Sequence, residues 1–263
     1  CPQDTTNPPR QRNDPQRSPG LPRAFTGLCH RPGMREVFHQ NLKIVSDQLV
    51  ELTHLAGSAM SRATTALIDA DLALAESVIT ADQRIDEVRA ELDALAIDLL
   101  ARQQPVAGDL RMVVTSMRMS SDLERMGDLA RHIAKVARLR YPNSAVPAEL
   151  RATIVEMGHI AEELVAKAGS VIASRDIVAA QELEHDDDAM DAKHRELFTR
   201  LADKWTHGTT AAVDITLLGR YYERFGDHAV SVASRVVYLV TGEWDLAVDH
   251  EDHEDLEDDL DLS

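Results

Sequence analysis

The sequence predicts an all-α protein built as two tandem three-helix bundles. Three observations predict this class. Apolar residues recur at helical spacing, no stretch shows sustained alternation of apolar and polar residues, and the chain repeats itself about 100 residues further on. Between residues 34 and 244, proline occurs only at positions 105, 142 and 147. Long helices with few breaks are therefore expected.

The first expected helix shows the spacing most clearly. From Phe38 to Ala63 the apolar residues alternate steps of four and three, which is typical of the seam of a bundle helix. Asp71 and Asp176 lie where the N-caps of the second and fifth helices belong, since a short carboxylate accepts the free backbone N–H groups there. The same spacing predicts helices near 35–69, 72–103, 106–140, 148–174, 177–205 and 209–241.

An internal duplication accounts for the number of helices. A shift of 105 residues aligns the acids of the second expected helix with those of the fifth. In the third and sixth helices the shift falls to 99, and it aligns Glu124-Arg-Met-Gly-Asp128 with Glu223-Arg-Phe-Gly-Asp227. We therefore expect two up-down-up bundles, the first over 34–142 and the second over 143–244.

The two ends of the chain differ from the middle. Residues 1–33 contain seven of the ten prolines and five arginines, and residues 245–263 contain ten acids with no Lys or Arg. Both segments are expected to be disordered. Cys1 and Cys29 lie in the first segment, so the folded part has no thiol, as expected for a cytoplasmic protein.

The charge of the chain restricts its partners. The formal net charge is −17, and residues 34–244 alone carry about −10 of it. An acidic surface repels phosphate backbones, which argues against nucleic-acid binding and favours cations or other proteins as partners. No apolar run is long enough and free enough of charge to span a bilayer.

Each repeat carries two pairs of acids at i, i+4 spacing, one pair on its second helix and one on its third. Residues four apart share a helix face. With 45 acids in 263 residues, however, roughly eight such pairs arise by chance, so the spacing alone is weak support for a site. The pairs are Asp82/Asp86 and Glu124/Asp128, named the first quartet, and Asp187/Asp191 and Glu223/Asp227, named the second quartet.

The positions of these acids relative to the turns are more informative than their spacing. Residues equally far from the turn of an antiparallel hairpin lie side by side. The first quartet is centred on Pro105 and the second on His207, which are the two expected turns. Each hairpin should therefore bring four carboxylates to one level.

Four carboxylates at one level repel one another. Two unit charges 4 Å apart cost about 4 kcal/mol at an effective dielectric constant of 20, and a bound cation removes that cost. Oxygen ligands predict a hard cation, with Mg²⁺, Mn²⁺ or iron favoured over Ca²⁺ and Zn²⁺. All eight acids of the two quartets are thus candidate metal ligands.

Two further residue types recur beside the quartets. Gly127 and Gly226 lie inside helices, where glycine costs about 1 kcal/mol relative to alanine. The absence of a side chain at each of these positions is explained either by the close approach of a ligand or backbone, or by tight helix packing alone. Arg125 and Arg224 are either partners of the carboxylates or plain surface residues.

At these residues the sequence resembles the PhoU family of phosphate-signalling proteins. The matching segments are Arg102–Arg111, Asp122–Asp128 and Tyr222–His228, and the likeness covers roughly residues 34–243. The second repeat departs from the pattern at Thr209–Ala212, which replaces the Pro-Val-Ala-Gly-Asp-Leu-Arg element of the first. The resemblance implies tandem three-helix bundles whose paired acids hold metal ions or multinuclear clusters.

The resemblance also implies a cytoplasmic regulator rather than an enzyme. PhoU-like proteins act between the PstSCAB phosphate transporter and the PhoR sensor kinase, and they repress the phosphate-starvation response when phosphate is plentiful. The implied partners are therefore a phosphate ABC transporter and a sensor histidine kinase, with membrane association only through them. A homodimer is expected as well.

Two other functions are compatible with a helical bundle. A ferritin-like di-metal oxidase uses Glu-x-x-His motifs, and two occur here, at Glu51/His54 and Glu156/His159. The first of these lies opposite the apolar seam of its helix and so faces outward, which disfavours an oxidase. In a purely structural adaptor, the acids would form solvated faces and bind nothing.

Overall fold

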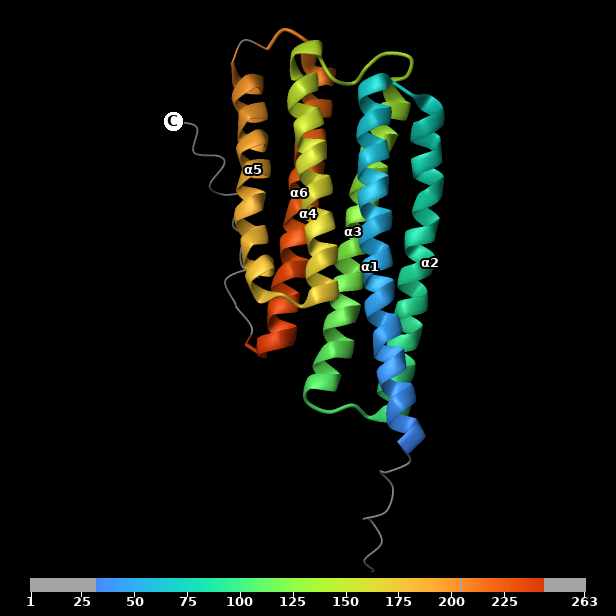
Figure 1. Ribbon diagram of the computed structural model, residues 1–263. Coiled ribbons are helices and arrows are strands. Elements are labelled where there is room, and N and C mark those ends of the chain that lie inside the picture. Colours follow the sequence, from blue (N-terminus) through green and yellow to red (C-terminus); the bar gives the residue numbers. More distant parts are fainter. Residues whose placement is uncertain (1–31, 204, 244–263) are drawn as a thin grey trace, which may run out of the picture.

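The computed structural model describes residues 32–203 and 205–243, and within them all regular structure is helical (Figure 1). The all-α class is therefore confirmed. The N-terminal and acidic C-terminal segments lie outside the described residues, apart from residues 32 and 33, which begin the first helix. The helices are α1 (Pro32–Asp69), α2 (Leu72–Gln103), α3 (Gly108–Arg140), η1 (Ala148–Leu150), α4 (Arg151–Ser174), α5 (Ile177–Ala202) and α6 (Gly208–Thr241).

The helix ends follow the signals in the sequence. Asp71 accepts a hydrogen bond from the backbone N–H of Leu74 at 2.9 Å. Asp176 accepts from Val178 at 2.9 Å and from Ala179 at 3.2 Å. Both predicted N-caps are thus confirmed, and each satisfies backbone donors that the first turn of a helix leaves free.

The duplication appears as two bundles lying side by side. Helices α1, α2 and α3 form one bundle and α4, α5 and α6 the other, with α1 against α4 and α3 against α6 (Figure 1). Buried apolar residues of both bundles form one continuous core. Each repeat therefore completes its core partly against the other.

Close helix packing and buried polar pairs join the two bundles. A Cβ at Gly158 of α4 would come within 2.7 Å of the Thr64 side chain in α1, so a larger residue there would force Thr64 to shift. The hydroxyl groups of Thr64 and Tyr222 are 2.8 Å apart in the core. Arg140 of α3 donates two hydrogen bonds, at 2.6 and 2.9 Å, to the buried carboxylate of Asp214 in α6.

Candidate metal centre

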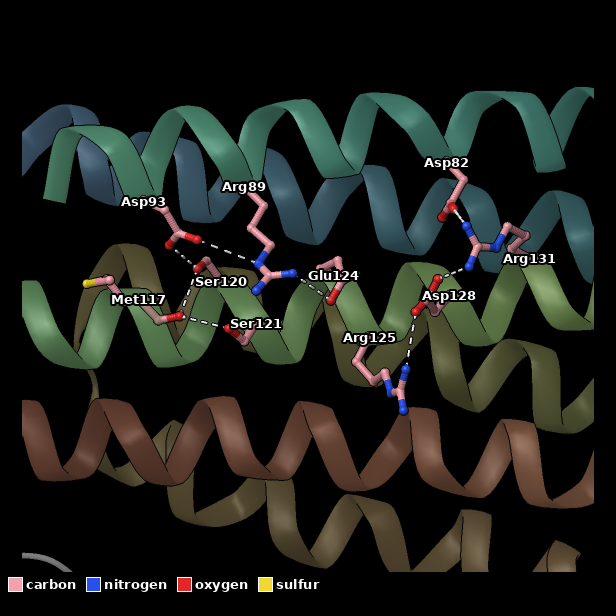
Figure 2. Close-up of polar contacts among 10 residues, drawn as sticks. All are labelled: Asp82, Arg89, Asp93, Met117, Ser120, Ser121, Glu124, Arg125, Asp128 and Arg131. Atoms are coloured by element: carbon pink, nitrogen blue, oxygen red, sulfur yellow. Dashed lines mark hydrogen bonds and ion pairs between the residues drawn. The ribbon is translucent and has the colours of Figure 1, made fainter. Parts of the chain in front are cut away.

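The first quartet lies midway along α2 and α3. Asp82 is buried at 5% exposure, Glu124 and Asp128 are partly buried, and Asp86 is exposed. The guanidinium of Arg131 donates to both Asp82 and Asp128, which joins the two helices (Figure 2). Asp82 and Asp128 are thus neighbours at one level, as their equal distance from the turn predicts.

Two more arginines contact this quartet (Figure 2). Arg89 of α2 lies 3.2 Å from Glu124 and 3.7 Å from Asp93. Arg125 lies 3.3 Å from Asp128. Three guanidinium groups therefore offset the negative charge of the first quartet.

Burial and neighbouring charges act in opposite directions on the first quartet. Burial raises the pKa of Asp82 above its ordinary value, while the charge of Arg131 lowers it and the nearby carboxylates raise it further. Burial likewise raises the pKa of Glu124, and Arg89 opposes that rise. Both carboxylates thus keep a partner that favours their charged form.

The second quartet is arranged at the same level on α5 and α6 but is less well neutralised. Glu223 is buried at 7% exposure, Asp187 and Asp227 are partly buried, and Asp191 is exposed. Arg220 donates to one oxygen of Glu223. Oε2 of Glu223 and Oδ1 of Asp187 are buried and have no hydrogen-bond partner among the described residues.

The pKa values of the second quartet reflect this lack of compensation. Burial, reinforced by Asp227 and Asp191, raises the pKa of Asp187 to about 8. Burial and Asp227 raise the pKa of Glu223 to about 8 against the opposing charge of Arg220. Burial also raises the pKa of Asp227 to about 6, again against Arg220. Near neutral pH this group either holds protons or needs a cation.

The two repeated glycines have different neighbours. A Cβ at Gly226 would overlap Oδ1 of Asp187, so the missing side chain makes room for a carboxylate against α6. A Cβ at Gly127 would meet Cδ1 of Ile85 at 2.6 Å and Oδ1 of Asp82 only at 3.4 Å. Gly226 therefore admits a quartet member, whereas Gly127 mainly serves helix packing.

The arginines that pair with the quartets most closely are not the ones that the repeat suggests. Arg125 does contact Asp128, and the positive charge of Arg224 lowers the pKa of Glu223 and Asp227. The main partners are Arg89, Arg131 and Arg220, which the sequence analysis did not identify. Arg131 and Arg220 lie three residues from an acid on the same helix, so the i, i+3 rule could have found both.

The carboxylate chemistry of the second quartet fits a hard cation. Among the described residues two buried oxygens lack a hydrogen-bond donor, and one of them, Oδ1 of Asp187, lies directly against Gly226. In the described part of the chain no three Asp, Glu, His or Cys side chains lie in a ready metal-binding arrangement, so ligation requires side-chain rotation. The first quartet fits a cation less well, because Arg131 and Arg89 already engage its oxygens.

The two Glu-x-x-His motifs lie on outer faces of the molecule. Glu51 and His54 are exposed, and Glu51 pairs with Arg84 at 3.0 Å. Glu156 and His159 are exposed too, and Glu156 pairs with Lys193 at 2.5 Å. The prediction that the first motif faces outward is confirmed, and neither motif contributes to an interior di-metal site.

No helix in the described ranges has an apolar stretch long enough to cross a membrane.

Comparison with known proteins agrees with the duplicated architecture. The PhoU domain matches residues 49–137 and residues 154–236, once in each bundle. The phosphate-specific transport system accessory protein PhoU homolog 2 of Mycobacterium tuberculosis is 50% identical over 210 residues, which cover 80% of this chain and 99% of that protein. PhoU homolog 1 of Mycobacterium leprae is also 50% identical over 210 residues, covering 80% of this chain and 95% of that one.

Solved structures show the same fold. The crystal structure of PhoU from Pseudomonas aeruginosa superposes with a TM-score of 0.69 at 29% identity, covering 78% of this chain and all of that one. The phosphate transport system regulatory protein PhoU from Streptococcus pneumoniae gives a TM-score of 0.67 at 27% identity, covering 79% of this chain and 99% of that one. With two domain matches and half-identical relatives over most of its length, this chain belongs to the PhoU family.

Proposed function

We propose that this protein is a cytoplasmic negative regulator of phosphate uptake and phosphate-starvation signalling. It acts through contacts with a phosphate ABC transporter and the sensor histidine kinase coupled to it, and it catalyses no reaction. The observation that supports this proposal most is the match of the PhoU domain to both bundles, together with relatives named as accessory proteins of phosphate-specific transport. A net charge of −17 favours action through proteins rather than nucleic acids.

Deletion of the gene in its own host tests this regulatory role. In phosphate-rich medium we expect a phosphate-starvation reporter to be derepressed and phosphate uptake to rise, with both restored by the full chain. Capture of a phosphate transporter subunit or a sensor kinase by the tagged chain would identify the partner. Unchanged reporter activity and uptake in the deletion strain would contradict the proposal.

We also propose that the second quartet binds a hard cation, with Mg²⁺, Mn²⁺ or iron as its occupant. Asp187 and Asp191 from α5 and Glu223 and Asp227 from α6 would hold it. The proposal is supported by two buried oxygens without donors among the described residues, and by the burial and mutual repulsion that raise the pKa values of Asp187 and Glu223. When bound, the cation supplies positive charge in addition to that of Arg220. Since the ligands lie on two helices, binding would also fasten α5 to α6.

Cation binding at the first quartet carries an additional cost. A cation there must replace Arg131 at Asp82 and Asp128, and Arg89 at Glu124. Breaking these partly buried ion pairs costs free energy, because each guanidinium group loses its carboxylate partner and must move to a position where water can solvate it. We therefore propose that the second quartet binds a cation more tightly than the first.

A pair of matched double variants of the full chain tests the two quartets. Asp187→Asn/Glu223→Gln removes charge from the second quartet, and Asp82→Asn/Glu124→Gln does the same at the equivalent positions of the first. With Mn²⁺ as the probe, thermal unfolding and elemental analysis measure binding, and circular dichroism checks helicity.

The expected result differs between the two double variants. A ligand at 100 times its dissociation constant stabilises the folded state by about 2.7 kcal/mol. The second-quartet variant should lose this stabilisation and the metal, and the first-quartet variant should keep most of both. Equal loss in both variants would contradict the preference for the second quartet, and no binding by the unaltered chain would contradict metal binding altogether.

A further inference from the structure

A surface groove of about 300 Å³ lies between the start of α3 and the end of α6. Leu110, Arg111, Val114 and Arg118 of α3 line one side, and Tyr238 of α6 lies opposite. Leu110 and Val114 are 42% and 39% exposed and lie one turn apart on the same face of α3. The groove thus combines an apolar floor with positive charge.

Arg111 connects this groove to the point where the described chain ends. Its guanidinium lies 5.4 Å from the ring centre of Tyr238 and donates to the Tyr238 backbone carbonyl at 3.4 Å. It also packs directly against Gly242, where a Cβ would overlap it. The chain therefore leaves α6 at the edge of the groove.

The residues that follow complement the groove in sequence. Trp244, Leu246 and Val248 are apolar, and Asp245 and Asp249 lie between and after them. All charged side chains from residue 245 to residue 263 are acidic, apart from two histidines. The four residue steps from Asp245 to Asp249 span about 13 Å in an extended chain, and the seven helical steps from Arg111 to Arg118 span about 10 Å. Long arginine side chains can reach both carboxylates over these distances.

We propose that residues 244–249 of this same chain occupy the groove. Trp244 and Leu246 cover Leu110 and Val114, while Asp245 and Asp249 pair with Arg111 and Arg118. A segment tethered this closely has an effective concentration in the millimolar range, so even weak contacts keep it bound. The occupied groove then excludes other acidic, apolar segments from this surface. The proposal is independent of the regulatory function and of metal binding at either quartet.

Fluorescence of Trp244 tests the proposal in the full chain. Trp205→Phe removes the only other tryptophan, and acrylamide quenching then reports how well Trp244 is covered. Arg118→Glu reverses one charge of the groove. It is preferable to a change of Arg111, which also contacts the end of α6. Arg138→Glu, an exposed position near the end of the same helix, is the matched control.

The expected result is a quenching constant at least twofold lower in the Trp205→Phe chain than in the same chain carrying Arg118→Glu. Arg138→Glu should change nothing, and 1 M NaCl should reduce the protection because it screens the ion pairs. In the chain with both tryptophans, Arg118→Glu should also speed cleavage of residues 245–263 by a glutamate-specific protease.

Two results would overturn the proposal. In the first, Trp244 is quenched in every variant as strongly as in a free peptide of residues 244–263, and proteolysis is unchanged. The groove would then not hold this segment. Protection that increases with protein concentration would show that the occupant belongs to a second copy of the chain. Loss of helicity in Trp205→Phe would leave the proteolysis comparison of Arg118→Glu with Arg138→Glu to decide the question.

Discussion

The two halves of the molecule carry the same four acids but surround them differently. In the first half, Arg131 joins Asp82 to Asp128 across the helix pair. The repeat offsets place Val230 at the position equivalent to Arg131, and His194 at the position equivalent to Arg89. The duplication has thus preserved the carboxylates and the exposed arginine Arg125, as Arg224, but not the two arginines that pair with acids across the helix pair.

This difference shows what four acids at the same level of a helix pair require. Carboxylates that are partly buried together need a partner that bears positive charge, or they take up protons. The first quartet meets the requirement with arginines of its own. The second leaves buried oxygens of Asp187 and Glu223 without a hydrogen-bond partner in the part of the chain that the structure describes. The protonation of this quartet therefore depends more on pH and on dissolved cations.

The largest expected effect is on the pH dependence of stability without metal. In the unfolded chain Asp187 and Glu223 have ordinary pKa values near 4, and in the folded chain both are raised to about 8. Between these values the folded state holds more protons than the unfolded state. Its stability therefore falls as pH rises, by about 1.4 kcal/mol per pH unit for each extra proton. Urea unfolding in EDTA from pH 5 to pH 8 should show a loss of about 7 kcal/mol, roughly half of it from each carboxyl group.

The matched double variants assign this slope to one quartet. Asp187→Asn/Glu223→Gln should flatten it, because neither amide titrates. Asp82→Asn/Glu124→Gln should leave most of it in place. If the first-quartet variant flattened the slope as much as the second, the two halves would not differ in the way their ion pairs indicate.

The next largest effect comes from making the first quartet resemble the second. Arg131→Met leaves Asp82 and Asp128 without their shared partner, and Asp82 is 5% exposed. In metal-free buffer we expect a loss of about 2–3 kcal/mol, below the usual cost of a fully buried pair because Arg131 is itself partly exposed. Mn²⁺ at 1 mM should recover part of this loss in the variant and add little at the first quartet of the unaltered chain. Chemical unfolding with and without Mn²⁺ measures both effects.

The converse change should make the second quartet resemble the first. Val230 is partly buried on α6, one turn beyond the acids, and an arginine there can keep its charged group near the carboxylates. Val230→Arg is expected to reduce the pH slope and to weaken Mn²⁺ binding. A variant that folds normally yet binds Mn²⁺ as tightly as before would show that the arginine is not what distinguishes the quartets.

The sequence was sufficient for the fold and for the level of the quartets. Helical periodicity, the capping residues Asp71 and Asp176 and the repeat offsets act locally or along the chain, so they can be read without coordinates. The centring of each quartet on its turn follows from the antiparallel hairpin alone.

The balance of charge within each quartet could not be read in the same way. Arg131 and Arg89 pair with acids across the helix pair, and whether a long side chain reaches depends on its rotamer and on the helix rotation. The repeat indicates Arg125 as a candidate partner, because it is duplicated as Arg224. It gives no such indication for arginines that lack a counterpart in the other half. Gly127 and Gly226 look equivalent in sequence, and only their neighbours distinguish them.

A smaller effect is expected from alanine at the two repeated glycines. Gly226→Ala pushes the Asp187 carboxylate away from α6, and we expect it to lower Mn²⁺ affinity about tenfold, which corresponds to about 1.4 kcal/mol. Gly127→Ala meets the flexible end of Ile85, and the gain in helix propensity of about 1 kcal/mol offsets that crowding. Calorimetric titration with Mn²⁺ compares the two variants. Equal affinities would mean that Gly226 is there for helix packing, as Gly127 is.

The smallest effect is expected at Arg125, the duplicated arginine of the first quartet. Its side chain is 62% exposed, and its contact with Asp128 at 3.3 Å lies one turn along the same helix. Exposed pairs of this kind contribute about 0.5 kcal/mol or less, and Asp128 keeps Arg131 when Arg125 is removed. Arg125→Ala should therefore change the free energy of unfolding by less than about 0.5 kcal/mol, and 0.5 M NaCl should abolish even that difference. A loss similar to that of Arg131→Met would mean that the first quartet is neutralised by its surface arginine rather than by the one that bridges α2 and α3.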